Sequence, residues 1–186
     1  MDPTTALQTY SSLLLNWSAR VNLLGPEARA HLEEHIAEAL EAGGILGVRG
    51  EVLDFGSGGG LPAIPLAIQA GNAARFHLVE AHAKKWSFLK YVVRECELNC
   101  IVHGDRLQRV LPTLTPGIRL NLVTSRAVGY PEKWVPLLKT RMADGGRVAL
   151  FQSTDEFPVI QGFEPDGMNR LSRGDHKFLA TLRCST

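Results

Sequence analysis

Residues 51–65 read Glu-Val-Leu-Asp-Phe-Gly-Ser-Gly-Gly-Gly-Leu-Pro-Ala-Ile-Pro, and this stretch decides the fold. Its apolar start predicts a short buried strand over Val52–Phe55. A loop follows that holds four glycines, Gly56, Gly58, Gly59 and Gly60. Pro62 then stands where a helix would begin. A strand, a glycine-rich loop and a helix in this order are typical of a nucleotide-cofactor site, because glycine lets the backbone approach a ligand closely.

Two classes of cofactor use such a loop. A dinucleotide fold needs the spacing Gly-x-Gly-x-x-Gly, but Leu61 takes the last position when the count begins at Gly56. The spacing Asp-x-Gly-x-Gly-x-Gly is met instead, by Asp54, Gly56, Gly58 and Gly60. A carboxylate at the strand end repels phosphate but attracts an amino group or a sulfonium. The stretch therefore favours S-adenosylmethionine over a dinucleotide, with a glycine turn that binds no ligand as the third interpretation.

Strands and helices alternate after this stretch. We expect further strands over Phe76–Glu80, Cys100–His103, Leu120–Thr124 and Arg147–Gln152. We expect helices over Pro62–Ala70, Ala83–Leu98, Arg106–Val110 and Pro131–Met142. Such alternation predicts an α/β, Rossmann-like fold with a mostly parallel sheet and helices on both faces.

The two ends of the chain depart from this alternation. Residues 1–45 predict a helical extension, with one helix over Pro3–Ala19 and a second that starts at Pro26 and is stopped by Gly43-Gly44. At the other end, Met168–Arg173 and His176–Cys184 flank Gly174-Asp175, which predicts an antiparallel hairpin. A hairpin at the end of a parallel sheet is the usual ending of Rossmann-like S-adenosylmethionine methyltransferases. We expect residues 1–186 to form one domain, in which residues 51–186 are the cofactor-binding part.

Two shorter segments connect the last strands. Asp144-Gly145-Gly146 predicts a turn that leads into the strand Arg147–Gln152. The link from Ser153 to Gly167 is only about long enough for a crossover, so any helix in it is small, over Asp155–Gln161.

Composition excludes several classes of protein. The 186 residues contain no apolar run of membrane-spanning length, and the N-terminus lacks a signal-peptide pattern. The three cysteines form no Cys-x-x-Cys pair, so we expect reduced thiols in a cytoplasmic protein and no metal site. No exposed apolar heptad suggests an interface, and we expect a monomer without membrane contact.

Charge is balanced overall but unevenly distributed. The net charge is +1. Residues 1–50 hold three basic and six acidic side chains, so the excess of basic residues lies in residues 51–186. Arginine outnumbers lysine 14 to 6, which suits bidentate contacts with phosphate. Solvated surface charge remains the ordinary explanation for most of these side chains.

Several polar residues are expected around one crevice, because ligands on parallel sheets bind beyond the carboxyl ends of the strands. Glu80 could accept the two ribose hydroxyls of a nucleoside, or be an exposed strand-end acid. Asp105 could meet an adenine edge, cap the helix that follows, or do both. Arg126 could bind an RNA phosphate, the cofactor carboxylate or a target base, or form a surface ion pair.

The chain resembles the family of 16S ribosomal RNA guanine-N7 methyltransferases called methyltransferase G or glucose-inhibited division protein B. The similarity runs from about Leu13 to Gln152 and returns at His176–Arg183. It is carried by Leu14-Leu15-Asn16-Trp17, by the loop from Asp54 to Leu66 with its two prolines, by Lys84-Lys85 after Glu80, and by Thr124-Ser125-Arg126-Ala127.

The resemblance implies binding of S-adenosylmethionine and methylation of a guanine N7 in 16S rRNA, on the 30S subunit or its precursor. It extends cofactor contact to Gly56, Leu61, Glu80 with Ala81, Arg106-Leu107 and Arg126. Arg126 would also steady the target guanine and is the catalytic candidate. RNA would be bound by Arg20, Lys84, Lys85 and Lys133. The chain departs from the family pattern at Leu107, where a glutamate is usual, and at Gln152, where a lysine is usual.

Other functions stay open at this stage. The chain could methylate another RNA or a small molecule. A closed, apolar crevice mouth would favour a small-molecule substrate. It could also be a non-catalytic relative that binds the cofactor or an RNA particle. A dinucleotide oxidoreductase would need Glu80 to bind an NAD ribose and Asp54 to tolerate a nearby phosphate.

Overall fold

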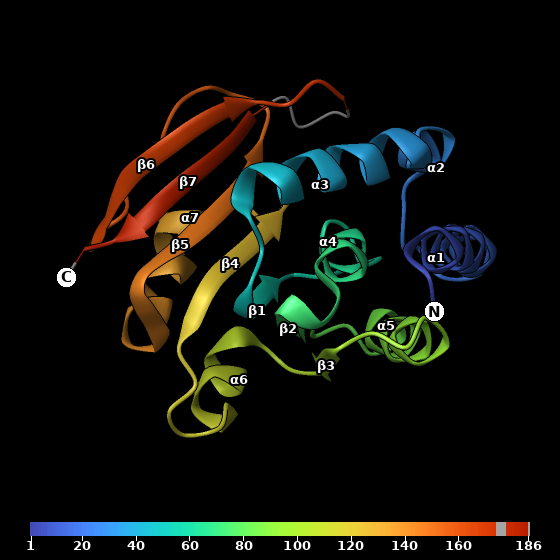
Figure 1. The fold of residues 1–186 in the computed structure, drawn as a ribbon, viewed down its shortest axis with the longest axis horizontal. Helices are drawn as coiled ribbons and strands as arrows, with labels where there is room; N and C mark the ends of the chain where they lie inside the picture. The colour runs from blue at the N-terminus through green and yellow to red at the C-terminus, as the bar shows by residue number, and fades with distance from the viewer. Residues whose placement is uncertain (174–177, 186) are drawn as a thin grey trace.

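A single sheet of seven strands organises the computed structural model, which describes residues 1–173 and 178–185 (Figure 1). Its strands follow one another in the order β3-β2-β1-β4-β5-β7-β6. In chain order they are β1 Gly50–Phe55, β2 Ala74–Val79, β3 Cys100–His103, β4 Leu120–Arg126, β5 Met142–Gln152, β6 Phe163–Arg170 and β7 Phe178–Cys184.

The first five strands are parallel, and the chain order reverses between β1 and β4. Strand β1 pairs with β2 on one side and with β4 on the other, so that Asp54 lies between Leu78 and Thr124. Ligands bind parallel sheets at such a switch point, beyond the carboxyl ends of the strands. Strand β7 is antiparallel to both β5 and β6 and lies between them, which confirms the mostly parallel sheet with an antiparallel end.

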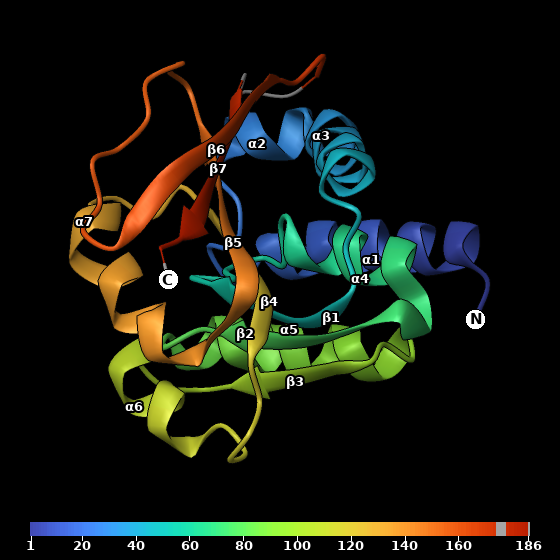
Figure 2. The ribbon, with the colours of Figure 1, turned by 60° about the vertical axis from the view of Figure 1, so that its left-hand side comes forward.

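Helices cover both faces of the sheet (Figure 2). In the described residues they are α1 Pro3–Ser18, α2 Pro26–Ala30, α3 Leu32–Leu46, α4 Ala63–Ala70, α5 Ala83–Glu95, α6 Leu107–Thr113 and α7 Pro131–Trp134. Two 3-10 helices, Gly71–Ala73 and Val135–Arg141, complete the set. Figure 1 shows α1, α4 and α5 grouped on one side and α6 and α7 on the other.

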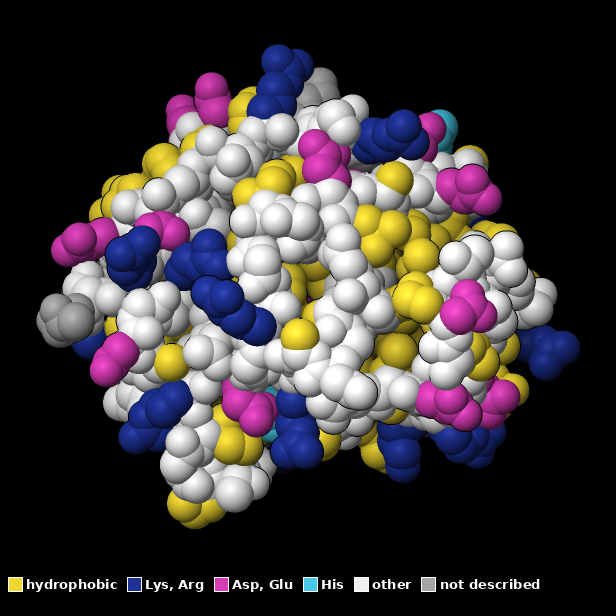
Figure 3. All heavy atoms as spheres, in the orientation of Figure 1, with side chains coloured by type: hydrophobic (Ala, Val, Ile, Leu, Met, Phe, Trp, Pro, Cys, Tyr) yellow, Lys and Arg dark blue, Asp and Glu magenta, His cyan; other side chains and the backbone are white. Residues whose placement is uncertain are grey.

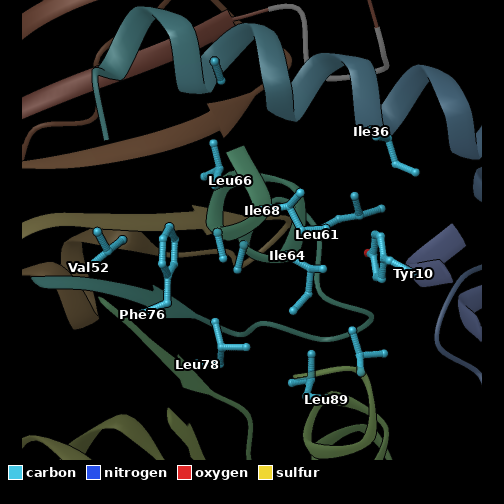
Figure 4. Packing of buried hydrophobic residues seen from close by; sticks show 14 of the residues in the cluster. Tyr10, Ile36, Val52, Leu61, Ile64, Leu66, Ile68, Phe76, Leu78 and Leu89 are labelled. Atoms are coloured by element: carbon cyan, nitrogen blue, oxygen red, sulfur yellow. The ribbon is translucent and has the colours of Figure 1, made fainter. Parts of the chain in front are cut away.

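The core has two parts because successive strand residues point to opposite faces. Val52 and Phe76 belong to a cluster with residues of α1, α3, α4 and α5, as Figure 4 shows. Leu53, the next residue of β1, belongs to a second cluster with residues of α6, α7 and the last strands. In Figure 4, Leu61 and Ile64 lie between the sheet and Tyr10, so the N-terminal extension packs directly against the start of α4.

The predicted second helix is wrong in two respects. It is broken at His31 into α2 and α3, and it continues through Gly43-Gly44 to Leu46. Gly43 does not stop the helix, because its missing side chain allows close contact with α4: a Cβ there would lie 2.9 Å from Leu66 Cδ2. Gly47, with φ of +57°, provides the left-handed residue that ends the helix.

The region around β5 also differs from the prediction. Asp144-Gly145-Gly146 lies inside β5 and forms a bulge, since the pairing with β4 shifts between Leu120 and Leu122. The expected small helix over Asp155–Gln161 is absent from this described stretch, which is an irregular connection.

The C-terminal hairpin is present and is longer on its first strand than expected. Strand β6 begins at Phe163, five residues before the predicted Met168. The proposed turn at Gly174-Asp175 and the residue His176 lie outside the described residues. The predicted helix over Pro131–Met142 is replaced by α7 and a 3-10 helix, with Pro136 inside the latter.

Candidate active site

The glycine-rich loop wraps around the carboxyl end of β2. The backbone N–H groups of Gly56 and Ser57 both donate to the carbonyl oxygen of Val79, at 3.0 and 3.1 Å. The loop then closes on itself before α4, where Ile64 N donates to Gly60 O at 2.7 Å. These bonds fix the loop against the carboxyl end of β2, next to β1.

Two of the glycines are required by both conformation and space. Gly56 and Gly60 have φ of +74° and +91°, which side chains rarely tolerate. A Cβ at Gly56 would lie 2.5 Å from Val128 Cγ2, and a Cβ at Gly60 would lie 2.5 Å from Ile64 Cγ1. The loop is therefore closely covered, on one side by the segment that follows β4.

Asp54 is a buried carboxylate at the base of the loop, with 1% of its surface exposed. Thr124 Oγ1 donates to Asp54 Oδ1 at 2.6 Å, while Oδ2 has no hydrogen-bond donor among the described residues. Burial raises the pKa of Asp54 to about 6, although the hydrogen bond from Thr124, the nearby Ser57 hydroxyl and the charge of Arg126 lower it. A cationic amino group would satisfy Oδ2 and favour the ionised form.

Glu80 directly follows β2, as predicted, and connects two parts of the site. Its Oε2 accepts a hydrogen bond from Gly58 N at 2.9 Å, and its Oε1 accepts one from His82 N at 2.7 Å. Each carboxylate oxygen has a second lone pair that can accept a ligand hydroxyl. With Asp54 and Glu80 both at the loop, the donor set fits a cofactor with an amino group and ribose hydroxyls better than a pyrophosphate.

Tyr10 closes the loop from the side of α1, a role that its sequence context did not reveal. Its hydroxyl donates to Gly59 O at 2.9 Å, and the side chain is fully buried. Burial, assisted by the charge of Asp54, raises the pKa of Tyr10, so the hydroxyl stays a donor. The sequence places Tyr10 on an apolar helix face, and a buried tyrosine hydroxyl usually has a hydrogen-bond partner. That position could have indicated a contact between Tyr10 and another part of the chain.

Arg126 is the last residue of β4 and lies under α3. Its Nη1 is 3.5 Å from Glu38 Oε2, and the side chains of the two residues are 10% and 0% exposed. Its charge is close enough to lower the pKa of both Asp54 and Tyr10. Arg126 is thus part of a largely buried ion pair beside the loop. It does not form a surface ion pair, and it does not lie beyond the end of its strand.

The third strand places its candidates at the edge of the site. Asp105 Oδ1 accepts a hydrogen bond from Arg106 N at 2.7 Å, and α6 begins one residue later, without a side-chain cap. Leu107 is fully buried in the core, which leaves only its main chain for a ligand. Gln152 is the last residue of β5, and its Nε2 donates to the carbonyl oxygens of Thr154 and Glu156, both at 2.7 Å.

The cations expected to bind RNA lie after α1, on α5 and on α7. Arg20 follows α1 and is exposed. Lys84 is exposed and Lys85 half-buried in the first turn of α5, after the exposed Ala81. Lys133 is exposed on α7, with its Nζ 4.3 Å from the centre of the Tyr130 ring.

The segment after β4 carries a feature that the sequence analysis missed. Ala127 and Tyr130 both have left-handed backbone conformations, with φ of +58° and +57°. Such conformations are costly for residues other than glycine and often occur at functional sites. Tyr130 is 68% exposed, so a large aromatic ring faces solvent next to Val128, which covers the glycine loop.

Comparison with known proteins identifies the family. A family profile described as rRNA small subunit methyltransferase G matches residues 4–160. The chain belongs to this family. Its proteins include one from Helicobacter bizzozeronii, 31% identical over 149 residues, which cover 80% of this chain and 81% of that protein. One from Magnetococcus marinus is 34% identical over 166 residues, 88% of this chain and 74% of that protein.

Coverage is lower for some relatives, and solved structures agree on the fold. The methyltransferase G of Anaeromyxobacter dehalogenans is 37% identical over 142 residues, 75% of this chain and 65% of that protein. A SAM-dependent O-methyltransferase from Thermotoga maritima superimposes with a TM-score of 0.58 at 14% identity, over 80% of this chain and 65% of that one. An rRNA methylase from Streptococcus thermophilus gives 0.54 at 12% identity, over 82% and 96%. The fold is that of the class I methyltransferases.

The described residues hold neither a metal-binding cluster nor a membrane-spanning helix. No group of three or more His, Cys, Asp or Glu side chains in residues 1–173 and 178–185 is arranged to bind a metal ion. Within the same residues, no helix is long and apolar enough to cross a bilayer.

Proposed function

We propose that this protein methylates the N7 atom of a guanine in 16S rRNA, on the 30S subunit or its precursor in the cytoplasm, with S-adenosylmethionine as the methyl donor. The observation that carries the proposal is the glycine loop over Asp54, whose Oδ2 has no donor among the described residues. Family membership supplies the ribosomal RNA context.

The residues around the loop would hold the donor by complementary charge and hydrogen bonds. Asp54 would pair with its amino group, and Glu80 would accept ribose hydroxyls. Gly56, Gly58 and Gly60 would let the main chain lie against it, beside Leu61 and Ala81. Asp105 and the main chain of Arg106-Leu107 would border the adenine.

The chemistry requires no side-chain base. When bound, S-adenosylmethionine supplies a methyl group on a positively charged sulfur. Guanine N7 has a free lone pair and no proton to lose, so no side chain of this protein would have to remove a proton before methyl transfer. The protein has only to align the two reactants and exclude water, and alignment alone can account for several kcal/mol of the barrier. The proposal accordingly assigns no histidine as a general base.

The segment after β4 would position the RNA. Tyr130 offers an exposed ring on which a base can stack, and the nearby Lys133 offers a charge for a phosphate. Arg126 would act without direct contact with the RNA, by keeping a positive charge close to Asp54 and to the target guanine. Arg20, Lys84 and Lys85 would contact the RNA backbone at the rim.

The first test is a calorimetric titration of the protein with S-adenosylmethionine, with NAD as the control ligand and Asp54→Asn as the variant. We expect micromolar binding of the methyl donor, weakened at least tenfold in the variant, and no binding of NAD. Binding of NAD instead would establish the dinucleotide alternative. A protein that binds neither would be a non-catalytic relative.

The second test identifies the product. Purified 30S subunits from cells that lack the enzyme are incubated with labelled methyl donor, and the rRNA is cleaved with aniline after borohydride reduction, which breaks the chain at N7-methylguanine. We expect one labelled cleavage site in 16S rRNA. Label in another nucleotide, or only in small molecules, would contradict the guanine N7 proposal and support another substrate.

A further inference from the structure

A polar cavity of about 440 Å³ lies at the opposite edge of the sheet from the glycine loop. It is formed where the parallel strands begin: Arg49 directly precedes β1, Asn121 is the second residue of β4, and Gly145 belongs to the bulge of β5. Arg147 and Arg183 complete its basic lining. None of these residues takes part in the proposed methyl transfer.

Arg147 and Arg183 face each other across two neighbouring strands. They are directly paired in the antiparallel register of β5 and β7, so their side chains project from the same face of the sheet. Like charges in directly opposite positions destabilise a sheet. The ion pair of Arg183 with Asp166 offsets part of this repulsion, and a bound anion between the two arginines would offset more of it.

Contacts with the protein orient both guanidinium groups without using all their donors. Arg147 Nη2 donates to Leu46 O, at the C-terminus of α3, at 2.6 Å. Arg183 Nη2 pairs with Asp166 Oδ1 on β6, and its side chain is 60% exposed. An arginine side chain has five N–H donors, so each keeps several for a ligand. Each side chain is therefore held by one protein contact and has further N–H donors that could bind an oxyanion.

The charge of the lining is positive. Three arginines and Asp144 give it a formal charge of +2, and Arg49 is exposed at the rim. Figure 3 shows Lys and Arg side chains gathered close to where Figure 1 draws β5 and the segment that joins α3 to β1. The forked donors of arginine match the geometry of a phosphate group.

We propose that this cavity binds a phosphate of the RNA backbone, as a second contact remote from the methylated base; the proposal rests on the proposed function. The six residues of β1 separate the two sites by about 20 Å. That distance corresponds to about six steps of a stacked nucleic-acid strand. An RNA held at both edges of the sheet would be fixed in direction as well as in position.

The test measures RNA affinity in variants of the cavity. Arg49→Gln and Arg183→Gln each remove one positive charge, and Arg94→Gln is the matched control, because Arg94 is 73% exposed on α5, outside the cavity. The probe is a fluorescein-labelled single-stranded RNA of about 20 nucleotides, followed by anisotropy over a salt series. We expect each cavity variant to weaken binding about fivefold and to reduce the salt slope by about one. The control and the affinity for S-adenosylmethionine should not change.

Two results would overturn this inference. Equal RNA affinity and salt slope in the wild type and both cavity variants would show that no RNA phosphate binds there. If pyrophosphate binds in an Arg49-dependent manner while RNA binding is unaffected, the cavity serves a free phosphate compound instead.

The outcome is separable from that of the proposed function. A wild type that fails to bind S-adenosylmethionine but shows the Arg49 and Arg183 effects would keep the RNA contact and lose the methyltransferase proposal. Normal binding of S-adenosylmethionine without the Arg49 and Arg183 effects would keep the methyltransferase proposal and contradict the RNA contact.

Discussion

The Asp54→Asn substitution should change how stability depends on pH, because Asp54 is buried next to the glycine loop. Burial raises the pKa of this carboxyl from 3.8 to about 6 on folding. The folded state therefore binds the proton more tightly than the unfolded state does. The resulting stabilisation is complete below pH 3.8 and is lost as the pH rises through 6.

The size of the effect follows from the two pKa values. From about pH 4.5 to about pH 7.5, Asp54 alone should lower the free energy of unfolding of the wild type by about 2 kcal/mol. Asparagine does not titrate, so the stability of the Asp54→Asn variant relative to the wild type should rise by this amount over the same pH range. The difference corresponds to roughly 4–8 °C in Tm for a protein of this size.

Urea unfolding of both proteins at a series of pH values, without methyl donor, measures this difference. Asp155→Asn, at an exposed position in the link between β5 and β6, serves as the control for the loss of one carboxyl group. The variant should also bind S-adenosylmethionine more weakly, so stability and function would change in opposite directions. A constant difference between wild type and Asp54→Asn across the pH range would refute the reasoning, since it would mean that the carboxyl is not desolvated.

Three further predictions concern the residues around the site. Gly60→Ala should lower the free energy of unfolding by about 2 kcal/mol or more, because Gly60 has a positive φ and crowded surroundings. Gly44→Ala, in the open part of α3, should raise the free energy of unfolding by about 0.5–1 kcal/mol. Urea unfolding of both variants measures these changes. Tyr10→Phe should cost about 1–3 kcal/mol in the same assay, because Gly59 O loses its donor, and an unchanged midpoint would contradict the contact. Tyr130→Ala should raise KM for 30S subunits about tenfold with unchanged methyl-donor affinity, and Tyr130→Phe, which keeps the ring, should behave like the wild type.

The strand, loop and helix around Asp54 could be predicted because their signals are local. A run of apolar residues, a set of closely spaced glycines and a proline act within a few residues of the chain. The same holds for the position of Glu80 directly after its strand. Once the strands are parallel, their carboxyl ends must meet at one edge, so the pattern could place Glu80 next to the glycine loop.

Features that depend on distant contacts were predicted wrongly or missed. Gly43 resembles a helix stop in the sequence, and only the packing of α3 on α4 explains why the helix continues through it. The sequence does not indicate that Arg126 lies under α3 beside Glu38, because these residues are 88 positions apart. The hydrogen bond from Tyr10 to the loop has the same origin.

The sequence by itself determined the class of fold and the glycine-rich loop, because these depend on short-range sterics, periodicity and spacing. Its motifs carried the resemblance to the family. The tertiary structure alone decided which charges meet. Burial leaves Asp54 Oδ2 without a donor in the described part of the chain, and strand register places Arg147 opposite Arg183. Register and burial are set by the packing of the whole sheet, since a shift of one residue would turn each side chain to the other face.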